Sequence, residues 1–253
     1  LTRQLLPATC DVLDRLEAGL RSFDDSMPEE HNRIGVDAVA SELFCSEQAG
    51  VDHLKEEVCK GHVHLVGNTM IDTLVRMMPL IRVQELPVDI APPFGVVTLH
   101  RPSNVDDQTT LRAVLEFLGT VSQLHPLVLP LHHRLRSAIE RWSIPVPDGI
   151  HCIDPLGYLP FLRLLMESAY ILTDSGGIQE EAVYLKKRCF TLRRNTERPS
   201  TIASGSNVLI DPERSDQCEL VLNYAKNPVS PKVIVPPLWD GRAGERIVAI
   251  LQK

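Results

Sequence analysis

One stretch of the chain combines residue types that bind anions. Residues 170–173 (Tyr-Ile-Leu-Thr) form a short apolar run typical of a buried parallel strand, and from Ile178 on apolar residues recur at helical spacing. Asp174-Ser175-Gly176-Gly177 therefore joins a strand to a helix. The glycines let the backbone approach a ligand closely, Asp174 or Ser175 can cap the helix, and the N–H groups of a helix start favour an anion. This turn predicts a phosphate site.

Two acidic residues follow the turn. Glu180 and Glu181 lie in the first turns of the predicted helix, where one carboxylate can accept two hydrogen bonds from a cis-diol such as a ribose. A tight strand-to-helix turn, with acidic side chains placed for the helix dipole, explains the same residues. Both interpretations stay open on the residues alone.

Other loops that follow predicted strands also carry functional side chains. His100-Arg101 comes after strand 94–99 and before a proline, and it has no evident packing role. Phe161 can pack on a planar ring such as uracil, although a place in the helix core explains it more simply. Arg193, Arg194 and Arg198 suit a diphosphate, because guanidinium groups match phosphate oxygens in fork geometry. A solvated surface loop is the alternative for these arginines.

The remaining candidates have simpler explanations. His62 and His64 fall on one face of a predicted strand, but a metal would need further ligands that the neighbouring sequence does not offer. Ser26 and Glu29 form a capping-box pattern around Pro28, so helix capping alone can explain Glu29. The six cysteines include no C-x-x-C pair, and G-x-G-x-x-G is absent from the chain. We therefore expect no metal and no cofactor.

Composition limits the class of protein. The 253 residues are 43% hydrophobic, enough to bury the core of one large or two small domains. A formal charge of −7 argues against nucleic acid as a partner, because the whole surface would repel a phosphate backbone. No apolar run approaches the ~20 residues that cross a bilayer, so we expect neither a membrane span nor a signal peptide. Cys152 and Cys189 fall in predicted strands as buried reduced thiols, which suits the cytoplasm.

The spacing of apolar residues predicts alternating strands and helices, with four prolines between Pro79 and Pro93 marking a linker. The pattern indicates an α/β fold with parallel sheets and helices on both faces. Ligands of such sheets bind beyond the carboxyl ends of the strands. Residues 1–15 show no clear period. The expected strands are 43–45, 62–66, 94–99, 127–131, 150–153, 169–173, 188–192 and 207–210, and the expected helices are 28–41, 47–58, 69–78, 111–124, 134–142, 159–168, 176–186, 214–226 and 241–252.

Seven motifs occur in a fixed order along the chain. They are Glu17-Ala18-Gly19-Leu20-Arg21-Ser22, Met27-Pro28-Glu29-Glu30 with Asn32-Arg33, Gly67-Asn68-Thr69 with Ile71-Asp72, Thr98-Leu99-His100-Arg101 with Asn104, Pro155-Leu156-Gly157-Tyr158-Leu159, Asp174 through Glu181, and Thr196-Glu197-Arg198-Pro199. Together they resemble the non-hydrolysing UDP-N-acetylglucosamine 2-epimerases of bacteria and archaea. The closing Asp240-Gly241-Arg242-Ala243 and the final helix also match, and Asp-Ser-Gly-Gly-Ile-Gln-Glu-Glu favours this branch over the hydrolysing relatives.

The resemblance implies two Rossmann-like domains of glycosyltransferase-B type, with a UDP-sugar in the cleft. On this basis we expect a partial N-terminal domain at 1–85 and a UDP-binding C-terminal domain at 86–253, with the last helix, 241–252, crossing back. A homodimer is expected as well. The implied catalytic residues are Glu17, Glu29 and His100, and the implied UDP contacts are Phe161, Ser175, Gly176, Gly177, Glu181 and Arg198.

The implied reaction interconverts UDP-GlcNAc and UDP-ManNAc. No carbonyl flanks the hydrogen on C2 of the sugar, so simple deprotonation is unfavourable. The route without a nicotinamide expels UDP while C2 loses its proton, giving a 2-acetamidoglucal, and then adds UDP back after protonation of the opposite face. Carboxylates serve the proton steps, while the helix dipole and arginines stabilise the departing diphosphate. The residues do not decide which carboxylate is the base.

Departures from the family pattern leave other functions open. The family's opening strand with its Gly-Thr-Arg-Pro-Glu loop, and a later Gly-Asp motif, are missing, so the chain is expected to lack the first part of the N-terminal domain. Ser103 and Ser200 replace glutamates that commonly follow His-Arg and Arg-Pro. The alternatives to an epimerase are a UDP-sugar-binding module without turnover and a glycosyltransferase of similar fold.

Overall fold

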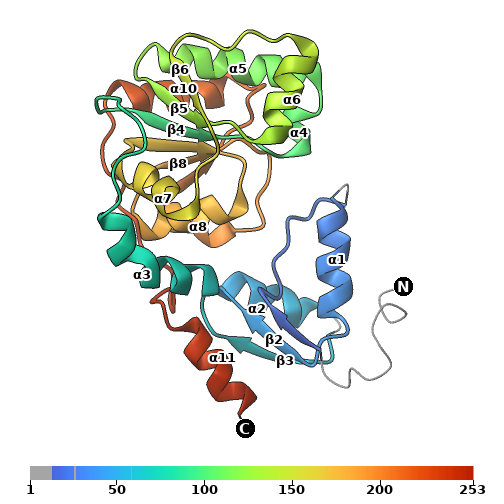
Figure 1. Cartoon of the computed structure of the whole chain (residues 1–253). Coiled ribbons are helices and arrows are strands. Elements are labelled where there is room, and N and C mark those ends of the chain that lie inside the picture. Colours follow the sequence, from blue (N-terminus) through green and yellow to red (C-terminus); the bar gives the residue numbers. More distant parts are fainter. Residues whose placement is uncertain (1–12, 26, 58, 253) are drawn as a thin grey trace. The chain divides into compact units, whose positions relative to one another are not determined.

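The computed structural model describes residues 13–25, 27–57 and 59–252, which divide into two compact units (Figure 1). The first unit contains the described residues up to Arg76, then Asn195–Ser200, and the chain from Val235 on. The second unit contains Met77–Arg194 and Thr201–Ile234. Each unit is built on its own parallel sheet, as expected for an α/β fold.

The first unit has three described strands in the order β1-β2-β3. Leu16 pairs with Phe44, and Phe44 pairs with His64, all in parallel register. Ile247 of the last helix packs against Phe44 and Val66 on one side of this sheet. The elements are β1 (Asp14–Leu16), α1 (Pro28–Asp37), β2 (Glu42–Cys45), α2 (Gln48–Glu56), β3 (His62–Leu65) and α11 (Ala243–Leu251).

The second unit has a six-stranded parallel sheet in the order β6-β5-β4-β7-β8-β9. Because β4 lies beside β7, segments far apart in the sequence become neighbours at the centre of the sheet. The strands are β4 (Gly95–Thr98), β5 (Leu127–Pro130), β6 (Ile150–Ile153), β7 (Tyr170–Thr173), β8 (Cys189–Thr191) and β9 (Asn207–Leu209). The helices are α4 (Pro102–Val105), α5 (Gln108–Ser122), α6 (His133–Trp142), α7 (Tyr158–Glu167), α8 (Gly176–Tyr184), α9 (Pro199–Ala203) and α10 (Ser215–Lys226).

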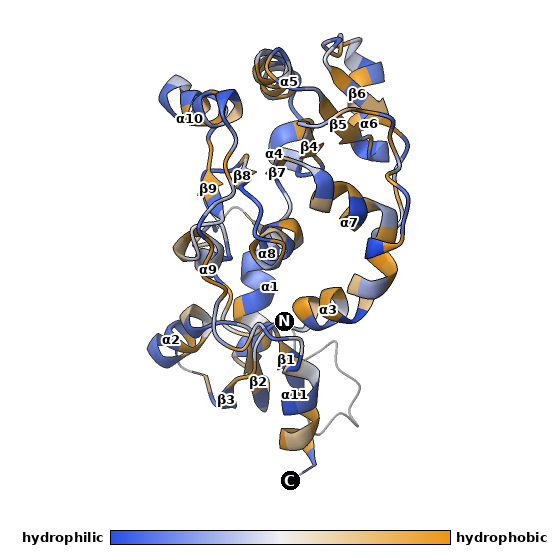
Figure 2. Ribbon diagram, turned by 90° about the vertical axis from the view of Figure 1, so that its left-hand side faces the viewer, coloured by the Kyte–Doolittle hydropathy of each residue, from blue (hydrophilic) through white to orange (hydrophobic). Residues whose placement is uncertain are grey.

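The larger sheet carries helices on both faces. α5, α6 and α10 contribute to one apolar cluster with the strands, while α7 and α8 lie on the opposite side (Figure 1). Figure 2 shows hydrophobic residues along β4 and β5 and a mixture of polar and apolar residues on covering helices such as α10. Burial of this apolar surface is the main stabilising contribution in such a unit.

Helix α3 (Thr69–Arg82) corrects the expected linker. It continues through Pro79, where the sequence predicted irregular chain, and it crosses the boundary between the units at Arg76. Leu74 and Ile81, seven residues apart, are both fully buried. Packing at helical spacing therefore outweighs the hydrogen bond that a proline removes.

Several local predictions also need correction. Cys189 is buried as predicted, but Cys152 is exposed because β6 is the end strand of the six-stranded order. The sequence missed β1, α4 and α9, all of five residues or fewer. Met27 precedes α1 without a side-chain cap, and Ser26 of the predicted capping box lies outside the described residues.

Candidate active site

The sheet of the second unit brings His100 and Asp174 together. His100 follows β4 and Asp174 follows β7, so both lie at the carboxyl ends of neighbouring strands. The Asp174 carboxylate is completely buried, and its Oδ1 lies 2.7 Å from Nδ1 of His100. It also accepts from the backbone N–H groups of His100 at 2.9 Å and Arg101 at 2.8 Å, and from Asn104 Nδ2 at 3.2 Å. The sequence had allowed Asp174 to cap α8, but its carboxylate accepts from these groups instead.

These contacts keep Asp174 ionised. Burial would raise the pKa of Asp174, but the contacts with His100 and the backbone N–H groups outweigh it and lower that pKa. The ionised carboxylate accepts from Nδ1 of His100 and so fixes the orientation of the imidazole ring. The His100 side chain is 42% exposed, so its Nε2 can meet a ligand. Such a pair suits general acid–base work.

Ser175 lies at the turn from β7 into α8, where the sequence predicted an anion site. Its backbone is extended, and its side chain makes no capping hydrogen bond to the helix. The Ser175 N–H donates to Thr173 Oγ1 at 3.0 Å, and its carbonyl accepts from Gln179 at 3.2 Å. Gly176 and Gly177 form the first turn, whose N–H groups have no partner within the helix. A phosphate can bind there.

Glu181, one turn further along α8, is 4% exposed. Burial raises the pKa of its carboxyl to about 7, and a hydrogen bond with Tyr158 acts in the opposite direction. Tyr158 and Phe161 lie one turn apart on α7. Phe161 is only half-buried and does not belong to the large apolar cluster of the sheet, so a fully buried core position does not account for it. A carboxyl that titrates near pH 7 is the kind found at functional sites.

Glu17 and Arg198 meet in the first unit. Nη2 of Arg198 donates to Oε2 of Glu17 at 3.2 Å, with the arginine almost buried and the glutamate one-third exposed. Glu17 has a φ of 54°, in the left-handed region that a residue with a side chain seldom adopts. Such backbone strain often accompanies a functional position.

Two glycines lock the segment after Glu17. Gly19 has a φ of +75°, and a Cβ atom there would lie 2.1 Å from the carbonyl oxygen of Gly50. A Cβ on Gly50 would lie 2.7 Å from the carbonyl oxygen of Ala18. The backbones after β1 and in α2 are therefore in direct contact, which only glycine allows at these two positions.

Glu29 and Glu30 are adjacent at the start of α1 but lie in different surroundings. The Glu29 side chain is exposed at the start of α1, whereas Glu30 is buried. Glu30 accepts from the N–H groups of Ser22 and Phe23, both at 2.9 Å, and from Arg33 at 2.9 Å. Burial would raise the pKa of Glu30, but these hydrogen bonds lower it. Glu30 is thus a structural anchor for the loop before α1.

The arginine-rich loop does not act as one group. Arg194 is exposed and pairs with Asp211 at 2.8 Å and Glu213 at 2.6 Å, in keeping with a surface role. Arg193 is buried in the second unit, while Arg198 belongs to the first. Arg198 contacts Glu17, which the family resemblance placed in catalysis.

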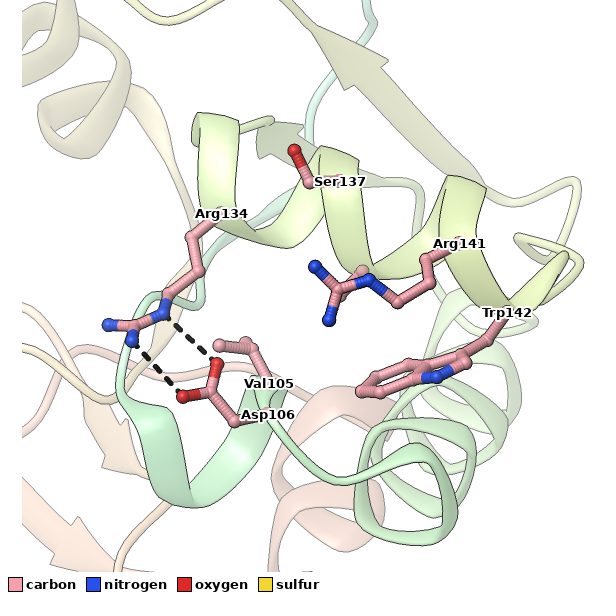
Figure 3. Close-up of a pocket in the computed structure, with 7 residues that line it drawn as sticks. Val105, Asp106, Arg134, Ser137, Arg141 and Trp142 are labelled. Carbon is pink, nitrogen blue, oxygen red and sulfur yellow. Dashed lines mark hydrogen bonds and ion pairs between the residues drawn. The ribbon is translucent and has the colours of Figure 1, made fainter.

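A separate cavity of about 380 Å³ lies beside α6 and is lined by Val105, Asp106, Arg134, Ser137, Ala138, Arg141 and Trp142. Figure 3 shows Asp106 facing Arg134 at one end and Arg141 with Trp142 at the other. Asp106 already holds Arg134 through two hydrogen bonds, at 3.0 and 3.1 Å. Because this ion pair neutralises the charge, we assign the cavity no part in the candidate site.

Two kinds of feature are absent from the described part of the chain: a metal site and a membrane-spanning helix. Within residues 13–25, 27–57 and 59–252, no group of three or more His, Cys, Asp or Glu side chains is placed to hold a metal ion. Nor does any helix in those ranges have the length and apolar character that crossing a membrane requires.

Comparison with known proteins identifies one family, and the match includes the candidate residues of both units. The family described as UDP-N-acetylglucosamine 2-epimerase matches residues 15–252. A UDP-N-acetylglucosamine 2-epimerase of Methanocaldococcus jannaschii is 35% identical over 252 residues, covering 93% of this chain and 67% of that protein. A UDP-2,3-diacetamido-2,3-dideoxy-D-glucuronate 2-epimerase of Pseudomonas aeruginosa is 39% identical over 205 residues, covering 79% of this chain and 56% of that protein.

Solved structures agree with the sequence matches. The crystal structure of the M. jannaschii UDP-GlcNAc 2-epimerase in complex with UDP-GlcNAc and UDP superposes with a TM-score of 0.86 at 32% identity. The match covers 95% of this chain and 69% of that one. The chain thus spans about two thirds of the length of the epimerases from M. jannaschii, and 56% of the P. aeruginosa relative.

Proposed function

Since this chain belongs to the UDP-N-acetylglucosamine 2-epimerase family, we propose that it interconverts UDP-GlcNAc and UDP-ManNAc by eliminating UDP and adding it back. The observation that carries the proposal is the His100–Asp174 pair, which adjoins the helix start at Ser175. A proton-transfer group and an anion site then stand at the same edge of one sheet.

The reaction sets the tasks of these residues. In the elimination, the C1–O bond to UDP breaks with its electron pair while C2 gives up its proton to a base, leaving 2-acetamidoglucal and UDP. In the return step a proton is delivered to the other face of C2, and a diphosphate oxygen forms the new bond to C1. No redox change occurs. Stabilising the departing diphosphate and moving one proton are the two requirements.

The second unit supplies groups for both requirements. The N–H groups at Ser175, Gly176 and Gly177 are proposed to bind the diphosphate. Nε2 of His100, held by Asp174, is proposed to exchange a proton with the reacting groups. Glu181 and Phe161 are proposed as partners of the ribose and the uracil ring.

The first unit contributes three further candidates. Arg198 is proposed as a cation for the diphosphate and Glu17 as a proton-transferring carboxylate. Glu29, exposed at the start of α1, is proposed on the family pattern alone.

Turnover of UDP-GlcNAc in deuterated water tests the proposal. NMR is expected to show deuterium entering C2 and UDP-ManNAc accumulating. UDP-2,3-diacetamido-2,3-dideoxy-D-glucuronate belongs in the same assay, because one relative carries that substrate in its name. UDP binding without deuterium incorporation from either sugar would indicate a binding module, and transfer of the sugar to an acceptor would indicate a glycosyltransferase.

A histidine pair of variants separates catalysis from folding. His100→Gln is expected to lower the rate of deuterium exchange by roughly 100-fold or more, the usual share of a general acid–base group. UDP binding should persist. The control is His151→Gln, which changes an exposed histidine on β6 and should leave both properties intact. Equal rates for the two variants would remove His100 from the mechanism.

The expected homodimer and cytoplasmic location also remain proposals. The described cysteines are free thiols, as a reducing compartment requires. Sedimentation velocity would measure the mass in solution, and a monomer across the micromolar range would contradict the dimer.

A further inference from the structure

Glu47 is a buried carboxylate to which the sequence gave no role. It directly precedes α2 with an extended backbone, and only 2% of the residue is exposed. It does not cap the helix with its side chain. Within the described part of the chain, neither oxygen of the carboxylate has a partner in full hydrogen-bond geometry. An ionised carboxylate that is buried without such hydrogen bonds is unfavourable unless a neighbouring positive charge compensates it.

The neighbouring charge belongs to Arg198. Burial raises the pKa of Glu47, while Ser200, the Arg198 guanidinium and, more weakly, His53 act in the opposite direction. Ser200 approaches through its hydroxyl and its backbone N–H, two residues beyond Arg198. Glu47 therefore faces the short segment 198–200 with its side chain.

Chain topology explains why this contact exists. β1 and β2 are parallel neighbours, and the N–H of Ala18 donates to the carbonyl of Phe44 at 3.1 Å. Glu17 follows β1 and Glu47 follows β2, so both carboxylates extend beyond the same end of the small sheet. Arg198 thus interacts with two acids of different accessibility: Glu17 is one-third exposed, whereas Glu47 is buried.

This difference suggests different tasks for the two acids. A ligand phosphate that binds Arg198 can replace Glu17, because the Glu17 side chain is one-third exposed and its carboxylate can turn to solvent. It cannot easily replace a carboxylate that solvent does not reach. We propose that Glu47 is a positioning residue. It keeps the Arg198 guanidinium in place when the diphosphate displaces Glu17 from that guanidinium. This inference rests on the proposed binding of UDP.

The experiment is a double-mutant cycle on UDP affinity. Glu47→Gln keeps the shape of the side chain but removes its charge. Without Glu47 the arginine must be ordered when the ligand binds, which is expected to weaken UDP binding roughly two- to tenfold. In an Arg198→Ala background the same change should have no further effect, because the group that Glu47 positions is absent.

The matched control is Glu56→Gln, which removes an exposed charge from the other end of α2 and should leave UDP affinity unchanged. Calorimetry measures the affinities, and urea unfolding verifies that each variant folds. An equal effect of Glu47→Gln with and without Arg198 overturns the inference, as does unchanged affinity accompanied by lost stability, which would mark a purely structural residue. If the unaltered chain does not bind UDP, the proposed function fails first, and the inference falls with it.

Discussion

The two units reach stability by different means. The larger unit buries one extensive apolar cluster formed by its strands and by α4, α5, α6 and α10, and it buries Asp174 at its candidate site. The smaller unit has only small described apolar clusters, beside which it buries a network of ion pairs. Arg21, only 2% exposed, donates to Asp37 at 2.8 Å and to Glu57 at 2.7 Å. Where apolar area is limited, the polar network determines a larger share of the structure, so we expect a charge substitution to weaken the smaller unit and a cavity substitution to weaken the larger one.

Removing Arg21 should have the largest effect. Arg21→Ala leaves the buried Asp37 with the more distant Arg15 as its cation, at 3.6 Å, and losing one partner of a buried pair costs roughly 3–5 kcal/mol of unfolding free energy. Hydrogen exchange followed by mass spectrometry should show faster exchange in the first unit alone. The control is Arg214→Ala, which breaks an exposed pair with Asp216 and should change nothing measurable. Equal loss in both variants would contradict the difference between the units.

A cavity in the larger unit should have a comparable but somewhat smaller effect. Leu118→Ala removes a fully buried side chain of α5, which typically costs roughly 2–5 kcal/mol. Leu220→Ala, on the exposed side of α10, provides the matched leucine control. Urea unfolding measures both variants. Faster exchange restricted to the second unit is expected, and a loss confined to the first would refute the assignment of this core.

Glu181 is one of the acidic side chains that the second unit buries, together with Asp174. Its pKa rises on folding to about 7, so between about pH 5 and 7 the folded state holds more protons than the unfolded chain. The contribution of Glu181 to stability is therefore favourable at low pH and is lost as the pH rises through 7.

Glu181→Gln cannot ionise and should therefore be more stable than the unaltered protein at pH 8, by up to roughly 3 kcal/mol, with a smaller difference at pH 5. Urea midpoints across this range measure the effect. Glu219→Gln, an exposed glutamate of α10, should show no such trend. If the stability difference between Glu181→Gln and the unaltered protein grows toward low pH instead, the pKa of Glu181 does not rise on folding.

The smallest effect concerns the joining of α11 to the first unit. Asp72 accepts from the N–H groups of Ala243 at 3.0 Å and Gly244 at 2.7 Å, so a distant carboxylate caps this helix. Asp72→Ala should cost roughly 1 kcal/mol, the usual value of such a cap. Exchange should accelerate in α11 and remain unchanged in the second unit. Unchanged protection of α11 would mean that the packing of Ile247 and the hydrogen bond from Arg246 to the Val66 carbonyl hold the helix without this cap.

Sequence periodicity predicted the regular elements because it reports local amphipathic patterns. It placed the strands of the larger sheet within one or two residues and recognised the turn at Ser175. It could not pair His100 with Asp174, since their contact depends on β4 lying beside β7 in addition to β5, the next strand in sequence. Nor could it single out Glu30 as the buried partner of the loop before α1, because only folding shows which of two adjacent acids points inward.

The same limit applies to Glu47. A glutamate before a polar helix carries no local signal, and its importance arises only when segment 198–200 returns to the first unit. Short elements such as β1 and α9 were missed because three to five residues do not establish a period. Long-range contacts therefore determine most of what the pattern of residues leaves open.

The contact between Gly19 and Gly50 has a consequence for how this sequence can vary. Neither glycine is a candidate ligand contact, yet every other amino acid at either position would force two backbones apart. In a library that samples all substitutions and selects for activity, both positions should tolerate as little change as the catalytic residues do. At these two glycines, intolerance in such a screen would reflect the close approach of two backbones and not a part in the reaction.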